Sequence, residues 1–278
     1  MPLAPGTTRP GEAILGLYRQ AVDLVQETLV KVQDAWNQLM DAVQGLLRRA
    51  ESFLNNDSVW STIVQKFTHE IVDAIEAING LISKIRPEVD KLFEALRKAA
   101  DNSVPVFSLF ETAITYSFDI VDQISGLSAD MTAYGDIDGW RGPAKISYEK
   151  RVADQIGAAD AASAKVEATS RWLGEVGTMN TSYMTNIAHM GAELVGQFVT
   201  AAIDATETVA GSVPSYVITL QHLSEFIGTA VQHQIDWVID LQQHFVNSLN
   251  QVNDLQNDTS DKTGFGRDYS WPAAASMA

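Results

Sequence analysis

The strongest constraint on the fold of this chain is a regular apolar seam near its N-terminus. Apolar residues recur at alternating steps of three and four over residues 11–54, the heptad pattern of helices that pack along their whole length. Such a helix is roughly 65 Å long, at about 1.5 Å of rise per residue. The seam consists of Leu15, Tyr18, Val22, Val25, Leu29, Val32, Trp36, Leu39, Val43, Leu46, Ala50 and Phe53.

Four further helices are predicted downstream, each bounded by turn-forming residues. The second is expected to kink or restart at Pro87, because proline lacks an amide proton and clashes with the preceding turn. The fourth is rich in alanine and glycine, which allow close helix approach but also mark expected bends. In the last helix Ile227, Val238 and Leu249 are eleven residues apart, a spacing typical of a straight rod. The approximate ranges are 60–100, 105–133, 143–210 and 214–255.

These patterns predict an all-α fold, an elongated bundle of about five long helices with antiparallel, coiled-coil-like packing. Strand-type alternation is almost absent. The predicted organisation is a flexible N-terminus (1–10), an N-terminal helical hairpin (11–103), a second helical hairpin with a long C-terminal helix (104–257), and a flexible tail (258–278) ending near Trp271-Pro272.

Composition argues against several function classes. The chain has no cysteine, which removes disulfides and thiolate chemistry. Its net charge of −16 repels phosphate backbones, so no nucleic-acid partner is expected. The N-terminus lacks the pattern of a cleavable signal peptide, and no window predicts an ordinary transmembrane helix. No catalytic or cofactor-binding motif is recognisable, so we expect neither enzyme activity nor a cofactor.

The clearest loop contains the tripeptide Trp140-Arg141-Gly142 between two predicted helices. Trp140 can fill the open end of a helical hairpin, and Gly142 is expected to relieve backbone crowding beside it. Pro143 suits the first turn of the following helix. Taken alone, this tripeptide predicts no more than a hairpin plug.

The surrounding string, from Gly139 to Glu149 with Tyr148 on the following helix, resembles the WXG100 superfamily of type VII (ESX) secretion substrates. The longer relatives that it looks most like are ESX secretion-associated proteins of the EspA/EspE and EspB type. The resemblance is specific over residues 109–168. It implies export to the envelope or medium without a cleavable signal, contact with the type VII machinery, and either a helical protein partner or self-association. Residues 11–100 would then cover the second hairpin in cis.

The family's export signal pairs W-x-G with a tyrosine followed four residues later by an acid. In this chain the only such pair is Tyr134 and Asp138, which makes it the candidate export motif. The pair precedes the turn, whereas in the family it lies beyond the hairpin. Residues four apart share a face only on a helix, and a loop with Gly135 weakens that geometry.

Other candidate sites are interpreted as solvated surface. His222, His233 and His244 recur every eleven residues, but neighbours are about 16 Å apart, too far for one ion to bridge. Asp130, Asp136 and Asp138 lack a calcium-loop pattern. No metal site is therefore predicted.

Two other functions remain open. In an α-helical pore-forming protein, residues 190–210 would be a latent membrane element. Their acidic residues disfavour insertion, so membrane contact is the less favoured prediction. An intracellular helical scaffold is the third interpretation, and it predicts no protein in the culture medium.

Overall fold

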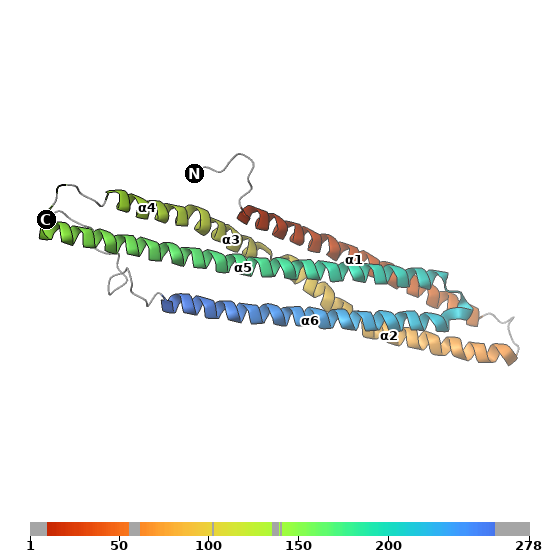
Figure 1. The fold of residues 1–278 in the computed structure, drawn as a ribbon. Coiled ribbons are helices and arrows are strands. Elements are labelled where there is room, and N and C mark those ends of the chain that lie inside the picture. Colours follow the sequence, from red (N-terminus) through yellow and green to blue (C-terminus); the bar gives the residue numbers. More distant parts are fainter. Residues whose placement is uncertain (1–9, 56–61, 102, 135–138, 140, 259–278) are drawn as a thin grey trace. The chain divides into compact units, whose positions relative to one another are not determined.

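The protein is all-α in a computed structural model that describes residues 10–55, 62–101, 103–134, 139 and 141–258. Figure 1 shows the order of the helices, and no strand occurs among the described residues. The all-α bundle predicted from the sequence is thus confirmed. The elements are α1 (Pro10–Leu54), α2 (Thr62–Asp101), α3 (Ser103–Ile114), the π-helix η1 (Thr115–Ile120), α4 (Val121–Tyr134), α5 (Pro143–Glu207), the short 3₁₀-helix η2 (Ala210–Ser212) and α6 (Val213–Asp258).

Two local predictions need correction. The second helix was expected to kink or restart at Pro87, and the restart does not occur, because α2 runs through that proline as one helix. Ile85 and Val89, on either side of it, are both buried, so side-chain packing continues past the missing backbone hydrogen bond. The third predicted helix is divided, because a π-helical turn lies between α3 and α4.

The chain forms two compact units that are discontinuous in sequence. Unit 1 comprises Met1–Tyr18, Val104–Asn180 and Leu241–Ala278. Unit 2 comprises Arg19–Ser103 and Thr181–Asp240. The predicted boundary between residues 103 and 104 coincides with a division between units, but residues 104–257 do not stay together. Within unit 2, residues 19–103 pack with the second half of α5, which is one arm of the W-x-G hairpin, and with the first half of α6.

The core of unit 2 is built from the predicted seams. Most seam positions of α1 are buried, although Phe53 at its end is 37% exposed. The α1 seam meets α5 at Trp36 and Phe198, whose ring centroids are 5.2 Å apart. Fully buried aliphatic side chains carry most of the hydrophobic stabilisation here. They include Leu39, Leu46, Ile71, Ile78, Ile85, Leu92, Leu96, Ile187 and Leu194.

Glycine in α5 allows a close approach to α1 within unit 2. A Cβ added at Gly191 would overlap the γ-methyl group of Thr28 and touch Val32 and Leu96. Thr28 is itself buried. Because a larger side chain would separate these helices, the close packing expected from the small residues of α5 is confirmed at this position. The expected bends do not interrupt α5, which is a single helix of 65 residues.

The C-terminal end of α5 is stabilised by a cation from α1. The last carbonyl groups of a helix lack amide partners and carry partial negative charge. Arg49 donates hydrogen bonds to the carbonyl oxygens of Ala205 (2.7 Å) and Thr206 (3.4 Å). The Arg49 guanidinium thus provides hydrogen-bond donors for carbonyl groups at the end of α5 and connects this end to α1.

Unit 1 has a thinner core. Tyr18 lies against the rings of Phe107 and Phe110 at centroid distances of 4.8 and 5.4 Å. Only a few of its described apolar residues are buried, and three of them are alanines. They are Tyr18, Val106, Phe110, Ala113, Ala158, Ala159 and Leu173.

We predict that Gly191→Ala lowers the free energy of unfolding by about 1–3 kcal/mol, because overpacking forces Thr28 and its helix to shift. Gly196→Ala is the matched control on the same helix, since an added Cβ there meets nothing within 4 Å. The control should gain up to about 1 kcal/mol from helix propensity. Urea denaturation of both variants measures the difference, and equal midpoints would contradict the close-packing argument.

A second prediction concerns alkaline stability. Burial raises the pKa of the Tyr216 hydroxyl, and the Asp204 carboxylate raises it further. This hydroxyl donates to the carbonyl oxygen of Ala201 at 3.0 Å. Because the folded pKa exceeds the unfolded value of about 10, the stabilisation is complete below that pH and is lost as pH rises through the folded pKa.

Tyr216→Phe should therefore unfold with a shallower alkaline dependence above about pH 10, and should lose about 1 kcal/mol at neutral pH. Denaturation midpoints measured from pH 7 to pH 11 provide the comparison. An unchanged alkaline slope would show that Tyr216 does not contribute to it.

Candidate recognition turn

The W-x-G turn joins the end of α4 to the start of α5. Its described residues, Gly139, Arg141 and Gly142, are all exposed, while Trp140 and Asp138 lie outside the described residues. Tyr134 is the last residue of α4.

Backbone conformation explains the two glycines of the turn. Gly139 has φ 101° and Gly142 has φ 88°, values that residues with a Cβ rarely adopt. A Cβ added at either position would meet nothing within 4 Å. The φ angle alone therefore favours glycine at both positions, whereas the expected crowding beside Trp140 concerns a residue outside the described ones.

The chain enters α5 directly after Gly142. The amide of Ile146 donates to the carbonyl oxygen of Gly142 at 3.5 Å, which closes the first helical turn. Pro143 is the first residue of α5, as predicted, where its missing amide proton costs nothing. Tyr148 is half-buried, whereas Ile146 is 67% exposed.

Cross-helix contacts pair α5 with the preceding helices in antiparallel register within unit 1. Ser128 of α4 donates to the Asp160 carboxylate at 2.9 Å. Further from the turn, Ser117 meets Ser170, and a Cβ at Gly177 would overlap the Phe110 ring. In these contacts the residue numbers on α4, η1 and α3 fall as those on α5 rise. The two sides are therefore antiparallel, and the turn closes a helical hairpin.

The π-helix η1 lies at a polar contact within this hairpin. Ser170 is buried and donates to the carbonyl oxygen of Ala113 at 2.8 Å. Since this uses its only hydroxyl proton, Ser117 is the donor in the 2.5 Å contact between the two hydroxyl groups. A π-helical turn changes which carbonyl groups are free to accept, and such turns are common at functional positions. Nothing in the periodicity of residues 105–133 predicted it.

Four of the histidines and acids that the sequence singled out are described by the structure and lie on its surface. His222, His233, His244 and Asp130 are all exposed, in line with the solvated-surface interpretation. His233 lies against Trp237, with ring centroids 6.2 Å apart. Within the part of the chain that the structure describes, no group of three or more potential ligands could hold a metal ion.

One face of the proposed latent membrane element is buried in unit 2, whereas Ile203 (49%) and Val209 (65%) are exposed. Within residues 190–210, Leu194, Phe198, Ala201 and Ala205 are at most 2% exposed. Another stretch, Thr68–Asp130, in which residue 102 lies outside the described residues, is long and apolar enough to cross a membrane by length and composition, with a mean hydropathy of 1.3 in its most apolar window. Core helices of soluble proteins also meet this criterion.

Comparison with protein-family models, with curated proteins and with solved structures finds no match for this chain.

The conformation of Gly142 generates a stability prediction. Gly142→Ala should lower the free energy of unfolding by about 1–2 kcal/mol, because an alanine at positive φ brings Cβ against the backbone. Gly157→Ala is the control, since Gly157 is an exposed helical glycine with open space around it. Amide hydrogen exchange at Ile146 should become faster in Gly142→Ala but not in Gly157→Ala, which would locate the strain at the turn. Equal free energies of unfolding for the two variants would contradict the prediction.

Proposed function

We propose that this chain is a type VII (ESX) secretion substrate or secretion-associated protein that acts by helix-mediated assembly and has no enzymatic role. The observation that supports the proposal most is the turn itself. Two glycines at positive φ hold an exposed connection between antiparallel helices. This geometry suits a recognition element in which Trp140 and Gly142 are read by the secretion machinery.

The arrangement of the hairpin supports the same proposal. Ser128–Asp160 and Ser117–Ser170 join its two sides at successive positions along α5. The turn is therefore displayed at the end of a fixed hairpin. Exposed residues at the start of α5, including Pro143 and Ala144, extend the accessible surface around it.

The unit boundaries bear on how assembly would work. Residues 19–103 belong to unit 2 together with the second half of α5, which is one arm of the W-x-G hairpin. Unit 1 carries exposed apolar side chains of its own, which suit contact with a helical partner or self-association. Leu127 on α4 is 48% exposed and Ile146 on α5 is 67% exposed.

Secretion tests the proposal. In an ESX-bearing host, Trp140→Ala and Gly142→Ala should each reduce the amount of protein in the medium at least about tenfold, while the amount inside the cells persists. Arg141→Ala is the matched control at the variable, exposed position of the tripeptide, and its export should be unchanged. Export of the two turn variants at the parent level would overturn the proposal.

Tyr134→Ala and Asp138→Ala, assayed in the same host, separate the turn from the candidate export motif. If that pair is the signal, each variant loses export while its stability is unchanged. Normal export of both would assign the signal to a partner protein and leave the role of the turn intact.

A membrane-perturbing function is the second candidate, and the apolar stretch Thr68–Asp130 favours it. It requires the purified chain to release dye from liposomes. A charge at Phe198 is unsuitable as a test, because that side chain is fully buried and the variant would lose its core. Leu127→Glu, at an exposed position of the apolar stretch, should abolish leakage without unfolding the chain if this second function is correct.

A further inference from the structure

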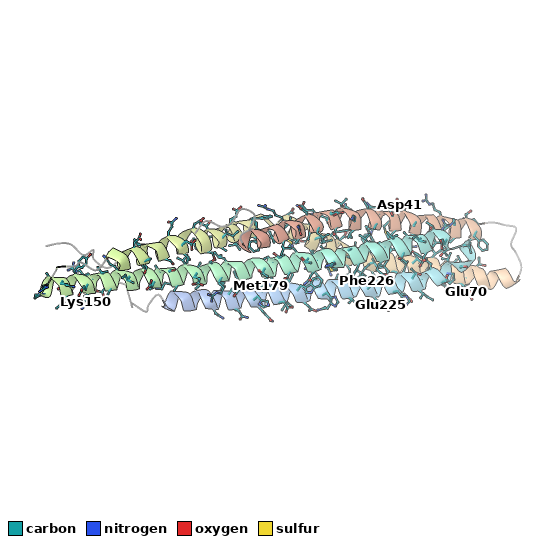
Figure 2. All side chains as sticks on the ribbon, turned by 45° about the horizontal axis from the view of Figure 1, so that its top comes forward. Asp41, Glu70, Lys150, Met179, Glu225 and Phe226 are labelled. Carbon is teal, nitrogen blue, oxygen red and sulfur yellow. The ribbon has the colours of Figure 1, made fainter. Side chains whose placement is uncertain are left out.

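An apolar groove lies within unit 1, between α3, α5 and the C-terminal part of α6. Its volume is about 570 Å³. Only two of its lining side chains are polar, and Figure 2 labels one of the others, Met179, on α5. The lining residues are Leu109, Val176, Met179, Asn180, Leu241, Gln242, Phe245 and Val246.

The α6 side of this groove is unusually exposed for an apolar surface. Phe245 and Val246 are each 54% exposed, and Leu249, one turn further, is 44% exposed. The eleven-residue stripe explains this exposure. Ile227 is buried in unit 2, whereas Leu249 of the same stripe lies open in unit 1. At Leu249 the apolar stripe therefore lies on a part of α6 that the described residues cover only in part.

We propose that residues 259–278, which follow α6, fold back and insert Trp271 into this groove. Large apolar side chains of this segment are concentrated at Phe265, Tyr269 and Trp271. The six residues that precede them, 259–264, are polar or glycine and form a spacer after α6. A spacer followed by an aromatic cluster is the pattern of a tethered ligand.

The length of the connection allows this contact. Phe245 lies thirteen residues before Asp258, the last residue of α6, which is about 20 Å along the helix. Trp271 lies thirteen residues after Asp258, and an extended chain of that length spans up to roughly 43 Å. A short tether also gives the tail a local concentration of about millimolar order, which compensates for a modest intrinsic affinity.

The chemistry of the groove matches an indole. Its apolar walls bury the ring, and a buried Trp needs one acceptor for its Nε1–H. The Asn180 amide nitrogen already donates to the Val176 carbonyl oxygen at 2.8 Å. The side-chain oxygen of Asn180 is therefore the proposed acceptor for the Nε1–H of Trp271. Docking would cover the exposed apolar side chains of Phe245 and Val246 on α6. This inference does not depend on export.

Distance measurement between two spin labels tests the inference, and the absence of native cysteine makes the labelling specific. One label is placed at Thr178→Cys, an exposed position of α5 beside the groove, and the other at Ser270→Cys. The full-length chain should give a narrow distance distribution. Trp271→Ala and Phe245→Asp should each convert it to a broad one.

Matched controls keep the test falsifiable. Pro272→Ala alters the tail but leaves the indole, and Gln243→Asp adds the same charge at an exposed position of α6 outside the groove; both should preserve the narrow distribution. Trypsin cleavage after Arg267 is the second measurement, and it should be about tenfold faster in Trp271→Ala, because cleavage follows the undocked population. A broad distance distribution in the parent chain would overturn the proposal. A narrow distribution that disappears when the labelled chain is diluted with unlabelled chain would also overturn it, because the contact would then be between two copies.

Discussion

The packing of α5 through its small residues is the constraint on which both compact units depend. α5 spans Pro143–Glu207 and contributes to each unit, and in each one a glycine permits a close approach of a neighbouring helix. Gly177 lies against Phe110 in unit 1, and Gly191 lies against Thr28 in unit 2. Dispersion attraction falls steeply with separation, so side chains larger than hydrogen at these positions would weaken packing along both neighbouring helices.

The two units differ in how completely they bury their apolar surface. Unit 2 combines α1, α2 and parts of α5 and α6 around a core of large aliphatic side chains. Unit 1 relies on α3, α4 and the other parts of α5 and α6, with alanines and a few aromatics in its core. Unit 1 therefore has the thinner core, and it carries both the apolar groove and the exposed residues of the turn.

Much of the fold was predictable because helical periodicity is a local signal. The α1 seam predicted burial of Val25, Leu39 and Leu46, and all three are buried. Pro143 and Gly142 predicted the start of α5 to the residue. The periodicity gave no sign of the π-helix, which lies where Ser170 contacts Ala113 and Ser117, residues more than fifty positions away. A restart at Pro87 does not occur, and Ile85 and Val89 on either side of it are buried.

The sequence by itself determined the helical class, most helix boundaries and the glycine turn between α4 and α5. These features follow from hydrophobic periodicity, capping residues and backbone φ preferences, which act over a few neighbouring residues. Only the tertiary structure decided which helices share a unit. It placed residues 19–103 against the far half of α5 and left Phe245 and Val246 exposed beside an apolar groove. Amphipathic seams specify that a helix must be covered, but they do not specify by which partner.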